Sequence, residues 1–387
     1  MTPLILATGA MGLGQSVLFM LVPLLAEHTG LQPWRLTFAL AVGTLMFLVG
    51  APRLGRASDR FGRRPVLAMA VGGYLASSLL LAAVVVAAAA GILGPETAFA
   101  LLLASRVAHG LTASGILPVA QAWIADVTPP EERLPRFARL SAGASIGRAL
   151  GPALGAGALL LHPLGPLVLM VLAPLPGLFA LTSRSGGGRP SAAAGSARLR
   201  WGDGRIARLL ATGWTTHTAL GLMLYTIGLL MQERLGLSGE AAAGALGGLM
   251  TAGAVVTAAV QAGIARRRPA ARTLLLAGAG ALTAGALAFA LAHDAVAFGA
   301  GFALTGAAAA LLLPSYVSSA SRAVEPHEQG AASGMLSASH TLGYAAGALL
   351  GGTAFELHPA CPFLLAAALA TSLPALALKP INAIATR

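Results

Sequence analysis

The segment Gly55–Leu67 reads GRASDRFGRRPVL and lies between two apolar stretches, residues 36–54 and 66–90. Its arginines are of the kind that stay in the cytoplasmic loops of a membrane protein. Gly62 permits a tight reversal of the backbone, and Asp59 is suited to capping the N-terminus of a helix, where the helix dipole is positive. This pattern predicts a cytoplasmic turn between two membrane-spanning helices.

The composition of the whole chain agrees with this expectation. Of 387 residues, 56% are hydrophobic and only 10% are charged, and the mean hydropathy is +0.78. A soluble domain carries about 25% charged residues, so the chain is predicted to cross a membrane several times. The single cysteine excludes an internal disulfide. The apolar start lacks a basic n-region, so we expect a first spanning helix there and no cleaved signal peptide.

Spanning helices need about 20 mostly apolar residues, and the sequence predicts twelve of them. Their expected ranges are 4–26, 36–54, 66–90, 97–124, 134–160, 162–183, 207–232, 239–263, 272–292, 295–320, 328–355 and 359–379.

The basic residues predict the orientation. Most of the 25 lysines and arginines fall in loops on one side of the predicted bundle or at the C-terminus, whereas Arg35 and Arg234 fall in loops on the other side. Cytoplasmic loops retain basic residues, so both termini are expected in the cytoplasm of a bacterium, with the chain in its inner membrane. The net charge of +12 is then a signal of topology, and no nucleic-acid partner is expected.

A linker and an internal repeat divide the chain. Residues 184–206, rich in Gly, Ser, Ala and Arg, predict a flexible cytoplasmic linker between six-helix bundles at 1–183 and 207–387. The two bundles match at a constant spacing, which pairs Pro118 with Pro314, Pro130 with Pro326, Glu132 with Glu328, and Gly147, Gly151 and Gly155 with Gly343, Gly347 and Gly351. Parallel six-helix repeats with a site between them describe a secondary transporter.

Three motifs carry a resemblance to a known family. GRASDRFGRRP resembles the loop 2–3 signature of the major facilitator superfamily, Gly-x-Leu-Ala-Asp-Arg-x-Gly-Arg-Arg/Lys, with Ala57–Ser58 as a departure. RVAHG, from Arg106, is similar to the family's Arg-x-x-Gln-Gly element, with His109 in place of Gln. GASIGRALGPALGAG, from Gly143, resembles a Gly-rich element found mainly in proton-driven exporters. The resemblance implies an all-α membrane protein with the twelve-helix fold of that superfamily.

The resemblance also implies a conformational latch. Asp59 would cap the eleventh predicted helix, and Arg63 would pair with Asp126 at the cytoplasmic end of the fourth. The simpler alternative is that these arginines only enforce topology. The implied latch residues are Gly55, Asp59, Arg60, Gly62, Arg63, Arg64 and Asp126.

The fifth predicted helix carries glycines at every fourth position, which form one smooth face and permit close contact with another helix. Pro152 can bend this helix. Packing alone would explain the pattern, and the resemblance adds that this packing shapes a gate. The residues concerned are Gly143, Gly147, Gly151, Pro152 and Gly155.

Polar residues inside the predicted spans are costly in lipid and are usually functional. They fall on helices that line the transport cavity in the superfamily. The predicted substrate-binding residues are Gln15, Arg106, Arg148, His217, Tyr316, His340 and Tyr344.

No carboxylate falls near the middle of a predicted span. Arg106 and Arg148, which do, are therefore predicted to be buried without a protein counter-ion. Arginine forms bidentate pairs with carboxylates and phosphates. The pattern therefore favours a positively lined cavity for a small organic anion. In the alternative, Arg106 binds backbone carbonyls and serves the gate.

His109, His217 and His340 are the titratable candidates for proton coupling, because histidine changes charge near neutral pH. Each could also be a hydrogen-bonding residue only. No metal-ligand spacing, no cofactor motif and no pattern of an enzyme active site stands out.

The sequence therefore predicts a monomeric, proton-coupled exporter of a small anionic molecule that works by alternating access. A siderophore or other metallophore, a metabolite or an antibiotic would fit. A broad-specificity multidrug antiporter and an organic-acid importer are the alternatives.

Overall fold

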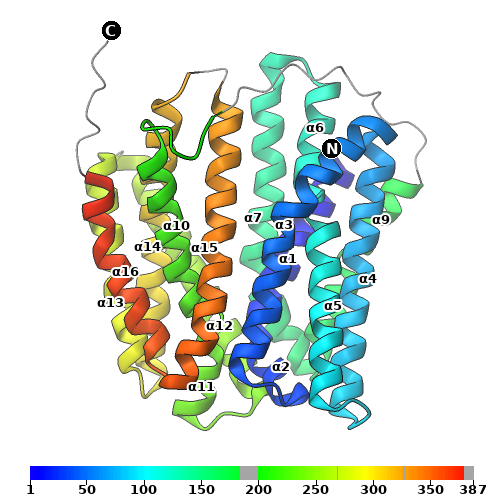
Figure 1. Cartoon of the computed structure of the whole chain (residues 1–387), viewed down its shortest axis with the longest axis vertical. Coiled ribbons are helices and arrows are strands. Elements are labelled where there is room, and N and C mark those ends of the chain that lie inside the picture. Colours follow the sequence, from blue (N-terminus) through cyan, green and yellow to red (C-terminus); the bar gives the residue numbers. More distant parts are fainter. Residues whose placement is uncertain (184–198, 268, 326–327, 379–387) are drawn as a thin grey trace. The chain divides into compact units, whose positions relative to one another are not determined.

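The computed structural model describes residues 1–183, 199–267, 269–325 and 328–378, and within these the structure is helical without a strand. It forms two compact units. Unit 1 comprises residues 1–192 and 228–251, and unit 2 comprises 193–227 and 252–387. The first helices are α1 Thr2–Met20, α2 Val22–Thr29, α3 Pro33–Phe61, α4 Arg63–Ala89, α5 Pro95–Ala113, α6 Ile116–Val127, α7 Pro130–Leu161, α8 Gly165–Leu172 and α9 Leu175–Thr182 (Figure 1).

The remaining helices are α10 Ala207–Leu224, α11 Ile227–Leu235, α12 Gly239–Arg267, α13 Ala271–Leu291, α14 Ala295–Arg322, α15 Gln329–Leu357 and α16 Cys361–Leu378. Helix α12 contributes its start to unit 1 and its end to unit 2. Residues 184–198 of the predicted linker lie outside the described residues, and 199–206 form turns.

Each of the twelve predicted spans is helical, but four are not single helices. The predicted spans 4–26, 97–124, 162–183 and 207–232 each consist of two consecutive helices. Proline accounts for the first break and the third, since Pro23 and Pro174 lie at or beside the break and cannot donate a helical hydrogen bond. Within the described residues, nine helical segments are long and apolar enough to cross a membrane, so the count of twelve spans stays a prediction.

Glycine determines how the main helices of unit 1 pack. Helix α7 lies along α1, and its glycines face that helix: a Cβ on Gly143 would approach Ile5 Cγ2 to 2.9 Å, and one on Gly155 would approach Met20 Cε to 3.0 Å. A Cβ on Gly147 would collide with the carbonyl oxygen of Gly9. The glycines at every fourth position of α7 thus form the smooth face that the sequence predicts.

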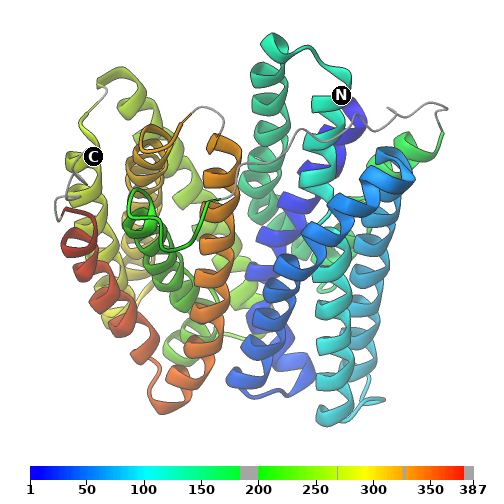
Figure 2. The ribbon, with the colours of Figure 1, turned by 45° about the horizontal axis from the view of Figure 1, so that its top comes forward.

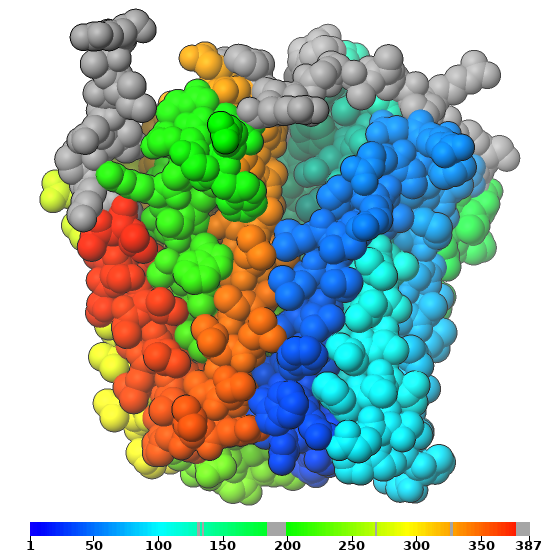
Figure 3. All heavy atoms as spheres, viewed as in Figure 1, coloured from blue at the N-terminus to red at the C-terminus, as the bar shows by residue number. Residues whose placement is uncertain are grey.

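Unit 2 repeats this arrangement with α15 along α10, while α16 packs on α10 and α13. A Cβ on Gly343 would lie 2.6 Å from the carbonyl oxygen of Trp214, and one on Gly347 would lie 2.5 Å from that of Thr218. Helix α10 lies between α15 and α16 in both ribbon views (Figure 2). The orange α15 and red α16 are at the surface of the drawn face (Figure 3).

The tight crossing of α1 and α7 predicts that Gly147→Ala lowers stability, because the added methyl group cannot fit against Gly9. Overpacking of this kind costs about 1–3 kcal/mol. Gly157→Ala in the same helix is the matched control, since nothing lies within 4 Å of its Cβ position. Thermal unfolding of the purified protein in detergent should show a lower midpoint for Gly147→Ala alone. Equal midpoints for both variants would contradict the packing described here.

Candidate functional site

A buried arginine joins three parts of unit 1 at the junction of α3 and α4. Arg63 Nε donates to Asp126 Oδ2 at 2.7 Å, its Nη1 donates to Ser58 Oγ at 2.7 Å, and it also pairs with Asp59. The side chains of Arg63 and Asp126 are only 6% and 9% exposed, whereas that of Asp59 is 50% exposed. The Arg63–Asp126 contact expected from the resemblance is therefore present.

The turn that allows this contact depends on Gly62, which has a positive φ of 97°. Such a conformation is strained for any residue with a side chain. Arg64 follows the turn and donates to the carbonyl oxygens of Leu181 and Thr182, at the end of α9. Arg60 lies over the ring of Phe61, and Gly55 accepts from Ser58 Oγ through its carbonyl oxygen. The segment thus ties α3, α4, α6 and α9 together within unit 1.

The capping role expected for Asp59 concerns the start of α15, in the other unit, and stays a prediction.

Arg106 has no charged partner among the described residues. Its residue surface is 2% exposed, its Nε donates to Ser105 Oγ at 3.3 Å, and its Nη1 and Nη2 atoms have no hydrogen-bond partner. Helix α3 lies against it, since a Cβ on Gly43 would approach Arg106 Cβ to 2.9 Å. The alternative in which Arg106 binds backbone carbonyls is not the arrangement found here. A guanidinium without compensation in an apolar interior costs several kcal/mol.

Arg148 differs from Arg106 in its exposure, and its predicted role in substrate binding stays a prediction. The residue is exposed in unit 1. It follows Gly147, and successive residues of an α-helix point in directions about 100° apart. The glycine face is directed at α1, so the arginine is turned away from that contact. Gln15 of α1 is also exposed.

His109 lies in a different polar environment within unit 1. Its Nδ1 is 3.3 Å from Ser77 Oγ, and its ring packs against the rings of Tyr74 and Phe47 at centroid distances of 5.3 and 5.8 Å. Tyr74 in turn donates to the carbonyl oxygen of Ala10 at 3.2 Å. These contacts hold His109 as a hydrogen-bonded residue of the bundle.

The four predicted site residues of unit 2 lie together. The rings of His217 and His340 stack at 3.9 Å with an interplanar angle of 14°. The Tyr344 ring packs edge-on against His217 at 4.9 Å, and Tyr316 Oη lies 3.0 Å from His340 Nε2. The sequence predicted these residues inside membrane spans, and the structure adds that they form one cluster. Whether it faces the same cavity as Arg106 stays a prediction.

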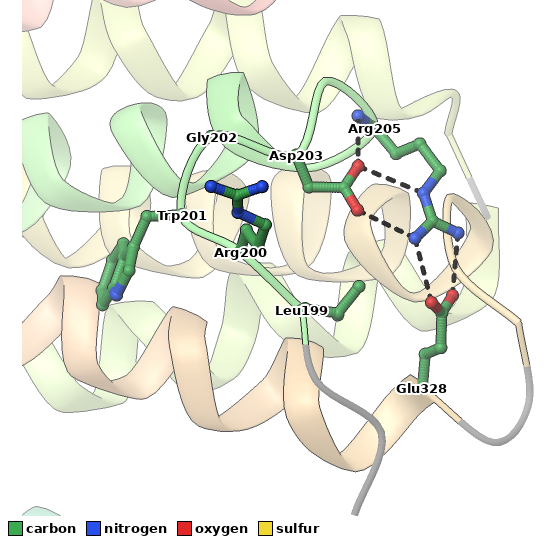
Figure 4. A pocket seen from close by; sticks show the side chains of 7 residues that line it. All are labelled: Leu199, Arg200, Trp201, Gly202, Asp203, Arg205 and Glu328. Carbon is green, nitrogen blue, oxygen red and sulfur yellow. Dashed lines mark hydrogen bonds and ion pairs between the residues drawn. The ribbon is translucent and has the colours of Figure 1, made fainter.

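One charged cluster was not predicted as a site. Arg205 binds both carboxylate oxygens of Asp203 and both of Glu328, with Nη2–Oδ2 and Nη1–Oε2 distances of 2.8 Å (Figure 4). A pocket of about 570 Å³ lies beside this cluster and is lined by Leu199, Arg200, Trp201, Gly202, Asp203, Arg205 and Glu328. The end of the predicted linker is thereby tied to the start of α15. The only signal in the sequence was the close spacing of Asp203 and Arg205.

Among the described residues no three His, Cys, Asp or Glu side chains lie together as a metal site would require.

Comparison with known proteins places these features in a family. The family model for the Major Facilitator Superfamily matches residues 4–302. The class C tetracycline resistance protein of Escherichia coli is 40% identical over 126 residues, 32% of this chain and 28% of that protein. A probable triacylglyceride transporter of Mycobacterium bovis is 29% identical over 124 residues, 32% of this chain and 22% of that protein. The chain therefore spans less than a third of the length of each of these relatives.

Solved structures share the fold over almost the whole chain. A D-xylose–proton symporter has a TM-score of 0.77 at 14% identity and covers 100% of this chain and 99% of its own. A human organic anion transporter has a TM-score of 0.66 at 22% identity, with 97% and 98% covered. These identities are low, so they show the fold alone.

The unequal burial of the two aspartates predicts unequal losses. Asp126→Ala leaves Arg63 buried without its main partner and should cost about 3–5 kcal/mol, whereas Asp59→Ala should cost at most about 1 kcal/mol. Thermal unfolding in detergent measures both. The double variant Arg63→Ala/Asp126→Ala should lose less than the sum of its single variants. Equal effects at Asp59 and Asp126, or full additivity, would show that the network does not exist.

The cluster around Arg205 predicts that the contact between residues 199–206 and the start of α15 depends on pH. The hydrogen bonds from Arg205 hold the pKa of Asp203 below its ordinary value of 3.8. A carboxylate with a lowered pKa stabilises the tied state above the unfolded pKa and loses this effect as the pH falls through the folded one. Amide exchange of residues 199–206, corrected for its intrinsic rate, should be slow from pH 7 to 5 and rise below 3.8.

In Arg205→Gln the exchange of these residues should already be fast at pH 7, and Arg272→Gln on α13 is the matched control. Slow exchange in Arg205→Gln would exclude the ion pairs as the cause of order.

Proposed function

The chain belongs to the major facilitator superfamily, and we propose that it exports a small organic anion in exchange for protons. As a member it is an integral membrane protein and a secondary transporter of small molecules. We place it in a bacterial inner membrane with both termini in the cytoplasm, because the basic residues of the loops favour that orientation.

The observation that carries the proposed substrate class is the state of Arg106. Only 2% of its residue surface is exposed, and both terminal nitrogens lack a hydrogen-bond partner among the described residues. A neighbouring carboxylate would have been the usual compensation for such a charge. A carboxylate or phosphate on the substrate would supply it, with two parallel hydrogen bonds to the guanidinium. The cost of the free charge then favours substrate binding.

Access to Arg106 requires movement, since the side chain is sealed in this conformation. Alternating access supplies such movement through rocking of two bundles about a central site. The Arg63 cluster lies within unit 1, so rocking of two bundles would not break it. Its proposed part in the latch is to hold Asp59 in place, and Asp59 would form the latch through its predicted cap on the start of α15.

Two observations support export over import. The relatives named as tetracycline resistance proteins include one 40% identical over 126 residues. The Gly-rich segment of α7 also resembles the element found mainly in exporters, and its glycines pack on α1. The second candidate is a multidrug antiporter that accepts neutral or cationic compounds, and the name of these relatives, which refers to resistance to a drug, is compatible with it.

Arg106→Gln is predicted to weaken the binding of anionic substrates and to spare that of neutral and cationic ones. Loss of an ionic contact at a buried site costs about 2–5 kcal/mol, or roughly 30-fold or more in affinity. Arg106→Lys should also impair them, because an ammonium cannot reproduce the planar fork of the guanidinium. The selectivity is measured as the uptake of a panel of anionic, neutral and cationic compounds into inverted membrane vesicles. Arg272→Gln, at an exposed arginine of α13 outside the predicted site, tests whether any lost positive charge has the same effect.

Removal of an unpaired buried charge should leave folding intact, so the thermal midpoint of Arg106→Gln should be unchanged or higher. A wild-type preference for cations, or equal loss of every substrate in Arg106→Gln, would reject the anion site and favour the multidrug alternative.

A further inference from the structure

The two stacked histidines of unit 2 lie in the crossing of α10 and α15, and the equivalent crossing of unit 1 packs without them. In unit 1, a Cβ on Gly147 would meet Gly9 and Leu13 of α1. In unit 2, a Cβ on Gly343 would meet Trp214 and Thr218 of α10 in the same register. The crossings α1–α7 and α10–α15 are therefore equivalent, residue by residue.

This register pairs Gly12 with Ala144 at the place where unit 2 pairs His217 with His340. In unit 1 the two small residues touch, since a Cβ on Gly12 would collide with the carbonyl oxygen of Ala144. In unit 2 the imidazoles fill the same place and stack at 3.9 Å. One crossing thus closes with small residues alone, so the histidines of the other have a role besides packing.

Each imidazole is fitted to a glycine of the facing helix. A Cβ on Gly343 would lie 2.8 Å from His217 Cβ, and a Cβ on Gly213 would lie 3.2 Å from His340 Nε2. Any larger residue at these two positions would displace a ring. The glycines therefore fix the imidazoles face to face.

Hydrogen bonds determine which nitrogen of His217 can accept a proton. Its Nδ1 lies 2.8 Å from the carbonyl oxygen of Gly213, and a carbonyl only accepts, so Nδ1 carries hydrogen. The lone pair of neutral His217 is then on Nε2, for which no partner is found among the described residues. Nε2 of His340 is already engaged with the Tyr316 hydroxyl at 3.0 Å. A proton on His217 Nε2 breaks no existing hydrogen bond.

We propose that His217 and His340 form a single proton-binding site, which takes one proton on His217 Nε2 and carries the coupling proton of transport. The proposal rests on the proposed proton-coupled function. Stacking allows one charge, because an imidazolium is attracted to the face of a neutral ring. Two like charges at this distance repel, so the second proton is excluded.

The surroundings of the pair contain no competing charge. The titratable groups that face it are Tyr316 from α14 and Tyr344 from α15. Helix α16, which also packs on α10, has no charged residue in Cys361–Leu378, and its one titratable group is the thiol at its first position. No carboxylate contacts either imidazole in the described part of the chain. A proton taken up by the pair would therefore meet no carboxylate in contact with it among the described residues.

The direct test is ¹⁵N NMR of the full-length protein in lipid nanodiscs, with labelled histidine and the proton itself as the ligand. Between about pH 4 and 9 the two rings should gain one proton together, since interacting groups titrate as a unit. His340→Gln should shift the midpoint of His217, whereas His109→Gln, the matched control in unit 1, should leave it unchanged. Independent titration of His217 and His340, or two protons per pair, would overturn the proposal.

Transport in proteoliposomes tests the coupling role separately. His217→Gln should abolish acceleration by a proton gradient while downhill exchange persists. The variant His217→Gly/His340→Ala copies the equivalent residues of unit 1 and should fold with the same loss of proton dependence. If the wild-type pair binds one proton but His217→Gln keeps its gradient-driven flux, the coupling role is refuted. Wild-type flux that ignores the gradient would instead refute the proposed proton-coupled function.

Discussion

The close approach of α7 to α1, and of α15 to α10, is the constraint on which the other features depend. In lipid, helices gain little from burying apolar surface against each other, so packing of small residues supplies much of the attraction. Glycines at every fourth position allow backbone atoms to touch along both crossings. The crossing in unit 2 fixes the stacked imidazoles, and the crossing in unit 1 turns Arg148 away from the helix contact.

The two proposed functional centres have different roles, anion binding at Arg106 and proton binding at the histidine pair. Arg106 is a permanent charge in a sealed environment, and its two Nη atoms lack a hydrogen-bond partner among the described residues, which is the reason to expect an anion. The histidine pair is neutral or singly charged, and its rings change state without breaking a hydrogen bond. An anion that leaves the cell and a proton that enters both move positive charge inward. In such an exchange the membrane potential and the proton gradient would drive export in the same direction.

Much of the fold could be predicted from the sequence, because apolar length and the placement of arginine depend directly on the membrane. The Arg63–Asp126 pair was expected only from the resemblance of the loop motif to its family, and the structure contains that contact. The breaks at Leu21 and Tyr225 could not be placed, because single helices and broken ones have the same hydropathy. The exposure of Arg148 was missed because depth along a helix says nothing of its face. The stack of His217 on His340 depends on the register of two helices far apart in sequence.

The charge moved in each transport cycle tests the central claim most directly. Electrical recording from proteoliposomes on a solid-supported membrane, with a proton gradient and a panel of anionic, neutral and cationic compounds, measures it. Exchange of an anion for a proton moves charge of one sign in both half-reactions, so the account predicts a large transient current with anions that disappears in Arg106→Gln. Electroneutral exchange of a cation for a proton, with no current from any anion, would contradict it.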